Sequence, residues 1–180
     1  MGTPVFLEDL NPTVIGETMK RSTYVLALVL GVLSSSVLAH GEKPHARKFS
    51  AAQLAEEKPF GKAGDPKRVT RTISFRMTDD MRFDPSHITV KRGETVRFIA
   101  RNDGKLMHEM VLGTVQALEA HAEQMKKFPG MEHDEPYMTH VPPGRTGEIV
   151  WQFTKPGVFD FACLIAGHFD GGMMGKVTVK

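Results

Sequence analysis

Three residues near the C-terminus combine side chains that bind soft metal ions. Cys163, His168 and Met173 follow one another with four residues in each interval, in a stretch between two strand-like segments. Two adjacent strands joined by a compact loop would bring this thiolate, imidazole and thioether around one point. The donor set suits copper, which accepts sulfur when reduced and nitrogen when oxidised. Zinc fits less well, because it prefers more Cys or His ligands and has little use for a thioether.

A second imidazole would complete a site of two His, one Cys and a weak axial Met, and His108 is the best candidate. It follows a turn region at 102–106 and begins the segment 108–112. In a sandwich this segment can lie beside the strand that ends at Cys163, so the separation along the chain is no obstacle. Two plainer interpretations stay open: His108 as a surface residue at a strand end, and Cys163 as a small buried apolar residue.

Two neighbouring methionines, Met173 and Met174, compete for the axial position. Val177 and Val179 are expected to face the core, so odd-numbered residues of the last strand point inward. Extended backwards, this register turns Met173 inward and Met174 outward. The glycines at 171–172 need not be extended, which weakens the extrapolation, but the pattern favours Met173.

The elements that must position these residues are short strands. Apolar and polar residues alternate along several segments, each bounded by turns that contain Gly, Pro or Asn. The segments are 69–77, 88–90, 95–101, 108–112, 149–153, 159–163 and 176–180. Short alternating strands at this spacing predict an all-β sandwich over residues 69–180.

One stretch interrupts the strand pattern. Residues 114–127 are rich in Ala, Glu, Gln, Leu and Lys and predict a helix, which ends at the sequence Phe128-Pro129-Gly130. An irregular segment follows as far as Gly144. We therefore interpret 114–144 as a helical insertion between two strands.

Residues 1–39 have the pattern of a secretory signal. Two basic residues at 20–21 precede an apolar run at 24–33, and small residues then lead to Ala39. Cleavage after Ala39 would deliver a periplasmic protein with no stable membrane span; the alternative is an uncleaved membrane anchor. Met19 opens this pattern and is an alternative translation start to the first methionine.

The segment 40–68 is predicted to be a flexible N-terminal arm. It holds few large apolar residues, and Leu54 and Phe60 are not expected to bury enough area to fix it. A helical turn or two is expected within 51–57. Export also affects Cys163, because a free thiol in an oxidising compartment needs to be buried, paired between chains or bound to a metal.

The composition limits the classes of function. The chain has 180 residues with 41% hydrophobic and 24% charged residues, which excludes a polytopic membrane protein. Its 23 basic and 21 acidic residues give a net charge of only +2, too weak a bias to indicate nucleic-acid binding. A single Cys excludes an internal disulfide, whereas 11 Met and 8 His supply many metal ligands.

These features together resemble a known family. Residues 81–180 are similar to the cupredoxins, the type 1 copper proteins that include plastocyanin, azurin, auracyanin and rusticyanin. The sequence at 83–98, FDPSHITVKRGETVRF, resembles the family's early strands, and the spacing of Cys163, His168 and Met173 resembles the ligand loop of rusticyanin and auracyanin. The segment 164–166 departs from many relatives, which have a Pro before the Gly-His pair.

The resemblance implies a Greek-key sandwich with one type 1 copper ion. His108, Cys163 and His168 would be its equatorial ligands and Met173 its axial ligand. Such a site leaves no coordination position for a substrate, and the sequence shows no paired carboxylates or nucleophile–base arrangement, so we expect a non-enzyme.

The expected function is one-electron exchange between Cu(I) and Cu(II). His168 would be the electron exit, with Phe169 and Met174 in an apolar docking surface, and the resemblance implies an exported c-type cytochrome as the partner. The sequence His108-Glu109-Met110 and the insertion look most like exported cupredoxins of bacterial copper tolerance, which implies a link to copper homeostasis.

The alternative function is copper sequestration in the periplasm, without a dedicated redox partner. It would use a second copper ion, held either by His40 and His45 or by residues of the insertion. The insertion candidates are Met125, Met131, His133, Met138 and His140. The plainer interpretation is that these are surface residues, as we interpret His87 and His121.

Overall fold

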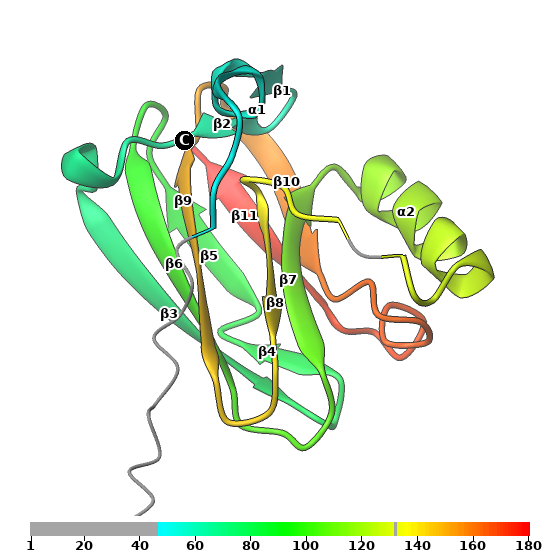
Figure 1. The fold of residues 1–180 in the computed structure, drawn as a ribbon. Coiled ribbons are helices and arrows are strands. Elements are labelled where there is room, and N and C mark those ends of the chain that lie inside the picture. Colours follow the sequence, from blue (N-terminus) through cyan, green and yellow to red (C-terminus); the bar gives the residue numbers. More distant parts are fainter. Residues whose placement is uncertain (1–46, 132) are drawn as a thin grey trace, which may run out of the picture. The chain divides into compact units, whose positions relative to one another are not determined.

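The structure is a computed structural model in which residues 47–131 and 133–180 are described. They form two β-sheets packed face to face, with one long helix beside them (Figure 1). The predicted signal at 1–39, its cleavage after Ala39, and the copper candidates His40 and His45 lie outside the described residues. No helix in the described part of the chain is both long and apolar enough to cross a membrane.

The two sheets confirm the predicted all-β sandwich, and each contains one parallel pair of strands. In the first, β3 pairs in parallel with β6; in the second, β5 pairs in parallel with β11; the other pairs are antiparallel. The first sheet has the order β1 (Glu57–Lys58), β2 (Gly61–Ala63), β9 (Thr146–Gln152), β6 (Thr95–Asn102), β3 (Arg71–Thr78), β4 (Arg82–Asp84). The second has the order β5 (His87–Val90), β11 (Met174–Val179), β10 (Gly157–Ala162), β7 (His108–Gly113), β8 (Met138–Val141).

Aromatic side chains from the two sheets form the core between them. The alternation along β6 buries Val96, Phe98 and Ala100 on one face, as the sequence predicts. Across the sandwich, the rings of Phe75 and Phe161 approach to 5.0 Å between centroids in an edge-to-face arrangement. Contacts of this kind add to the hydrophobic stabilisation of the core.

The pairing of β10 with β11 fixes the ends of the ligand loop. Phe161 lies opposite Gly175 and Ala162 lies opposite Met174, so the loop leaves and re-enters the sheet at adjacent positions. A Cβ at residue 175 would lie 2.2 Å from the Phe161 ring, so only glycine allows this close packing. The loop between Cys163 and Met173 therefore starts and ends at the same end of the sandwich.

The predicted helix of the insertion is present as α2 (Val115–Lys127), capped by the hydroxyl of Thr114. Its buried face, Leu118, Ala122 and Met125, packs with Leu164 in a second apolar cluster outside the main core. The expectation of an irregular segment as far as residue 144 is wrong at Met138–Val141, which forms β8 and pairs with β7. This edge strand has only four residues and no clear alternation, so the period gives no strand signal.

The prediction of a flexible arm over 40–68 is wrong for the described residues 47–68. The first short helix, α1 (Ala51–Ala55), agrees with the expected helical turn, and a 3-10 turn, η1 (Pro66–Arg68), follows β2. Between them Phe60 is only 5% exposed, its ring stacks on Trp151 at 5.2 Å, and its carbonyl accepts a 2.9 Å hydrogen bond from Trp151 Nε1.

A second contact ties the start of this segment to the sandwich. The guanidinium of Arg47 donates to the carbonyls of Met138 in β8 and Glu148 in β9, one from each sheet. β2 also extends the first sheet by pairing with β9. One aromatic anchor and backbone pairing therefore compensate for the low apolar content of the segment.

Candidate metal centre

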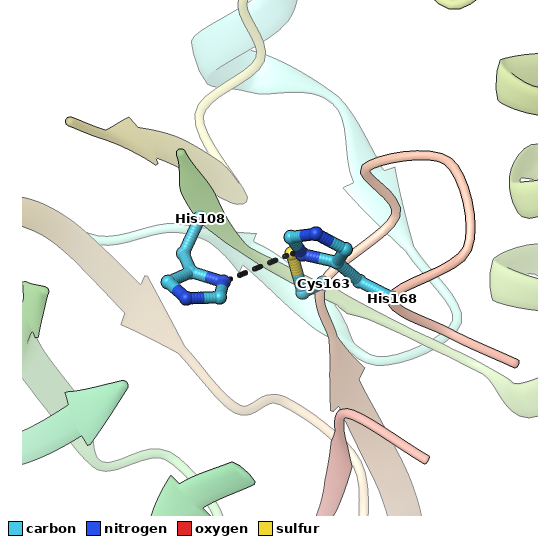
Figure 2. Close-up of side chains that lie close together, drawn as sticks. All are labelled: His108, Cys163 and His168. Atoms are coloured by element: carbon cyan, nitrogen blue, oxygen red, sulfur yellow. Dashed lines mark hydrogen bonds between the residues drawn. The ribbon is translucent and has the colours of Figure 1, made fainter. Parts of the chain in front are cut away.

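Three of the four predicted ligands converge at one end of the sandwich. His108 begins β7, Cys163 follows β10, and the two strands pair side by side, as expected from the sequence. The Cys163 Sγ lies 3.3 Å from His168 Nδ1 and 4.0 Å from His108 Nδ1 (Figure 2). One donor atom from each of these residues lies within 4.8 Å of the other two, and the two imidazole rings are 5.0 Å apart.

The fourth predicted ligand, Met173, is held beside these residues by the backbone. Its carbonyl accepts a 3.0 Å hydrogen bond from the Cys163 N–H, and its own N–H donates to the His168 carbonyl at 3.1 Å. Met173 is fully buried in the same core cluster as Cys163. Met174 is half-buried and packs against the cluster beside α2. The inward orientation of Met173 is therefore the one that the strand register predicts.

The electrostatics of the centre favour neutral ligands until a cation arrives. Burial raises the pKa of the Cys163 thiol to about 12. Burial and then the nearby His108 lower the pKa of His168. A bound cation would compensate for the burial of a thiolate, so metal binding is coupled to loss of the thiol proton.

A contact outside the donor set orients His108. Its Nε2 lies 3.2 Å from the Asp79 carboxylate, while its Nδ1 faces Cys163. Asp79 is itself held by the backbone N–H groups of Lys105 and Leu106; the first of these is the main cause that lowers the pKa of Asp79. Hydrogen bonds of this kind fix the orientation of a ligating imidazole. Asp79 carries no signal in the sequence, because only the fold brings the turn after β3 next to His108.

The turn that precedes His108 is fixed by a buried amide. Asn102 is fully buried, and its Nδ2 donates to the carbonyls of Leu106 and Val141 at 2.7 and 2.8 Å. Its Oδ1 accepts a hydrogen bond from the N–H of Gly104. Both sheets therefore contribute to the position of the loop that leads to His108.

Glu109 connects to the Cys163 side of the centre. Its backbone N–H donates to Cys163 Sγ at 3.4 Å, and its carboxylate accepts a 2.8 Å hydrogen bond from the N–H of Leu164. N–H groups directed at sulfur stabilise the thiolate form. The donor set, its burial and these supporting contacts all fit a copper ion bound by two nitrogens and sulfur.

The fold brings together only some of the candidates for a second copper site. Met125 and Met138 are buried in the apolar cluster beside α2, so they are not available as surface ligands. His133 and His140 do come together, and His121, expected from the sequence to be a plain surface residue, lies beside His133. Burial and then the nearby His133 lower the pKa of His121.

Comparisons with known proteins agree with the centre. Residues 70–180 match the family described as copper binding proteins, plastocyanin/azurin family. A copper-resistant cuproprotein CopI of Rubrivivax gelatinosus is 47% identical over 86% of this chain and 94% of its own length. A protein of the same name from Pseudomonas aeruginosa is 31% identical over 90% of this chain and 96% of its own length.

Solved structures show the same fold at lower sequence identity. Auracyanin B superposes with a TM-score of 0.56 and 19% identity, over 67% of this chain and 96% of its own. The auracyanin of Roseiflexus castenholzii gives 0.54 and 22%, over 62% and 98%. These likenesses support the sandwich architecture around the centre.

Proposed function

Because the chain belongs to the copper-binding plastocyanin/azurin family, we propose that it is an exported one-electron carrier and not an enzyme. His108, Cys163, His168 and Met173 would hold one type 1 copper ion. When bound, copper supplies reversible exchange of one electron between Cu(II) and Cu(I). The observation that carries the proposal is the close, buried grouping of the two imidazoles and the thiol.

The contacts around the ligands support this role. Asp79 holds His108, Glu109 holds the backbone beside Cys163, and backbone hydrogen bonds tie Met173 to Cys163 and His168. Ligands fixed in this way move little between oxidation states. A small reorganisation favours fast electron exchange over the capture of a substrate.

His168 is the ligand through which electrons would leave the protein. It is 8% exposed, whereas His108 and Cys163 are fully buried. Leu106 and Met107, which directly precede His108, are 47% and 41% exposed. We propose that these apolar side chains take part in docking an exported c-type cytochrome. Phe169 and Met174, the docking residues expected from the sequence, are less available, because they are half-buried against the cluster beside α2.

The biological context that we propose is copper homeostasis in the periplasm. Its support is the name of the relatives, copper-resistant cuproprotein, and the extent of the match at 47% identity. The second candidate function is copper sequestration without a redox partner. The specific observation in its favour is the cluster of imidazoles near α2.

A growth test separates the two functions. A strain that lacks the gene is complemented with the wild type, with Cys163→Ser or with Met173→Gln, and growth is followed at increasing copper. Met173→Gln should keep copper bound but at a lower potential, because an oxygen donor favours Cu(II). The carrier proposal predicts that both variants lose tolerance. If Met173→Gln protects as well as the wild type, sequestration is the better account.

A further inference from the structure

A second group of metal-binding side chains lies outside the type 1 centre. The group contains His121 of α2, His133 of the following segment and His140 of β8. The ring centroids of His121 and His133 are 4.7 Å apart, and those of His133 and His140 are 6.5 Å apart. The carboxylate of Glu109, from β7, approaches the same group, with its Oε2 3.0 Å from His140 Nε2. Four elements or segments thus bring three imidazoles and one carboxylate together.

Two buried polar atoms at this place point to a missing ligand. Glu109 is 1% exposed, and its Oε2 has no hydrogen bond of acceptable geometry among the described residues, although His140 is close to it. The buried Nδ1 of His133 is likewise without a hydrogen-bond partner among them. Buried polar atoms are normally satisfied, and a bound ion is one of the usual reasons for an exception.

Neighbouring rings of the group lie near the separations found around a bound metal ion. An imidazole centroid lies about 3.2 Å from a metal ion bound at about 2.0 Å, so cis rings are about 4.5 Å apart and trans rings about 6.4 Å. The His121–His133 rings, at 4.7 Å, lie near the cis separation, and the His133–His140 rings are 6.5 Å apart. The donor atoms of the group are not all within 4.8 Å of one another, so a bound ion would draw them closer together. In the type 1 centre the two imidazoles are 5.0 Å apart.

We propose that His121, His133, His140 and Glu109 form a second metal site, which binds Cu(II). Imidazole nitrogens and a carboxylate oxygen in a tetragonal arrangement are the ligands that Cu(II) prefers, and Cu(II) binds such sites more tightly than Zn(II) does. The site differs from the His/Met cluster expected from the sequence, since Met125 and Met138 are buried elsewhere and Glu109 takes part.

The surroundings give a metal ion access to the site. His121, Met131 and His133 line a cleft of about 450 Å³, whose other wall includes Lys58 and Phe60 of the N-terminal segment. On the inner side, Glu109 contacts Cys163 through its backbone N–H and Leu164 through its carboxylate. The second ion would therefore bind between solvent and the type 1 centre.

The test is a titration of the full chain after its type 1 centre has been loaded. A second equivalent of Cu(II) is added, and electron paramagnetic resonance follows a signal with the large copper hyperfine splitting of an ordinary tetragonal site. Pulsed measurements report the imidazole nitrogens bound to it. We expect one such equivalent, bound at least tenfold more weakly in His121→Gln and in His133→Gln.

Two controls make the outcome decisive. His87→Gln removes an exposed imidazole on β5, away from the cluster, and should leave the second equivalent unchanged. His40→Gln/His45→Gln should also leave it unchanged. The proposal is overturned if the second signal is absent, if it survives His133→Gln with wild-type affinity, or if it depends on His40 and His45. The type 1 absorption of each variant reports separately on the fold and on the carrier proposal.

Discussion

The surroundings of Cys163 disfavour the charged thiolate form of its side chain. Burial raises its pKa from 9.0 to about 12, while the N–H of Glu109 is directed at the sulfur. The first effect keeps the metal-free thiol protonated, and the second stabilises the thiolate once a cation replaces the proton. The centre is therefore shaped for the metal-bound form of this residue.

The raised pKa predicts how the stability of the metal-free protein depends on pH. The folded state binds the thiol proton more tightly than the unfolded state, so this stabilisation is complete below pH 9 and is lost as the pH rises towards 12. At pH 10.5 the loss should be about 2 kcal/mol. Urea unfolding of the metal-free wild type and of Cys163→Ala at pH 8 and pH 10.5 measures it; parallel losses in the two proteins would argue against the shift.

The two methionines offer a matched pair at the same scale. Met173 lies in the core with Cys163, and Met174 packs beside α2. Met173→Gln should retain copper but lower the reduction potential, because an oxygen donor stabilises Cu(II), whereas Met174→Gln should change the potential little. Protein-film voltammetry of both variants gives the comparison. Equal shifts would assign no special role to Met173.

At the scale of the elements, local patterns predicted the strands that carry the ligands. The alternation along β6 and β10, and the spacing from Cys163 to Met173, are local features of the sequence. The sequence did not predict β8, because its four residues at a sheet edge show no alternation of apolar and polar side chains. The role of Phe60 and the proximity of His121 to His133 depend on contacts between segments far apart in the chain, and no local pattern encodes those contacts.

The N-terminal segment gives a prediction at this scale. Phe60 is buried against Trp151, so Phe60→Ala should lower the free energy of unfolding by about 3–5 kcal/mol. Leu54→Ala, at a side chain that is 47% exposed, should cost less than about 0.5 kcal/mol. Urea unfolding of the metal-free proteins distinguishes them. A small effect at Phe60 would mean that this segment adds little to the fold.

At the scale of the whole described domain, two exposed apolar residues lie at the same end of the sandwich as the ligands. Leu106 and Met107 precede His108, whereas Val158, at the other end of β10, is exposed at 59%. An electron carrier needs an apolar contact surface near its exit ligand, and this arrangement provides one. The opposite end supplies an internal control.

Electron transfer should therefore depend on which end is altered. Met107→Glu places a charge in the proposed docking surface and should slow the reduction of an exported c-type cytochrome at least several-fold, with the copper potential unchanged. Val158→Glu should leave the rate near that of the wild type. Stopped-flow kinetics under pseudo-first-order conditions measures both. Equal rates for the two variants would place the docking surface elsewhere.

The most direct measurement of the central claim is the visible spectrum of the protein loaded with Cu(II). Cys163 is the only thiol in the chain, so a type 1 centre must show an intense thiolate-to-copper charge-transfer band that Cys163→Ser abolishes while its far-ultraviolet circular dichroism stays that of a β protein. A wild type without this band, or a band that persists in Cys163→Ser, would contradict the assignment of the centre.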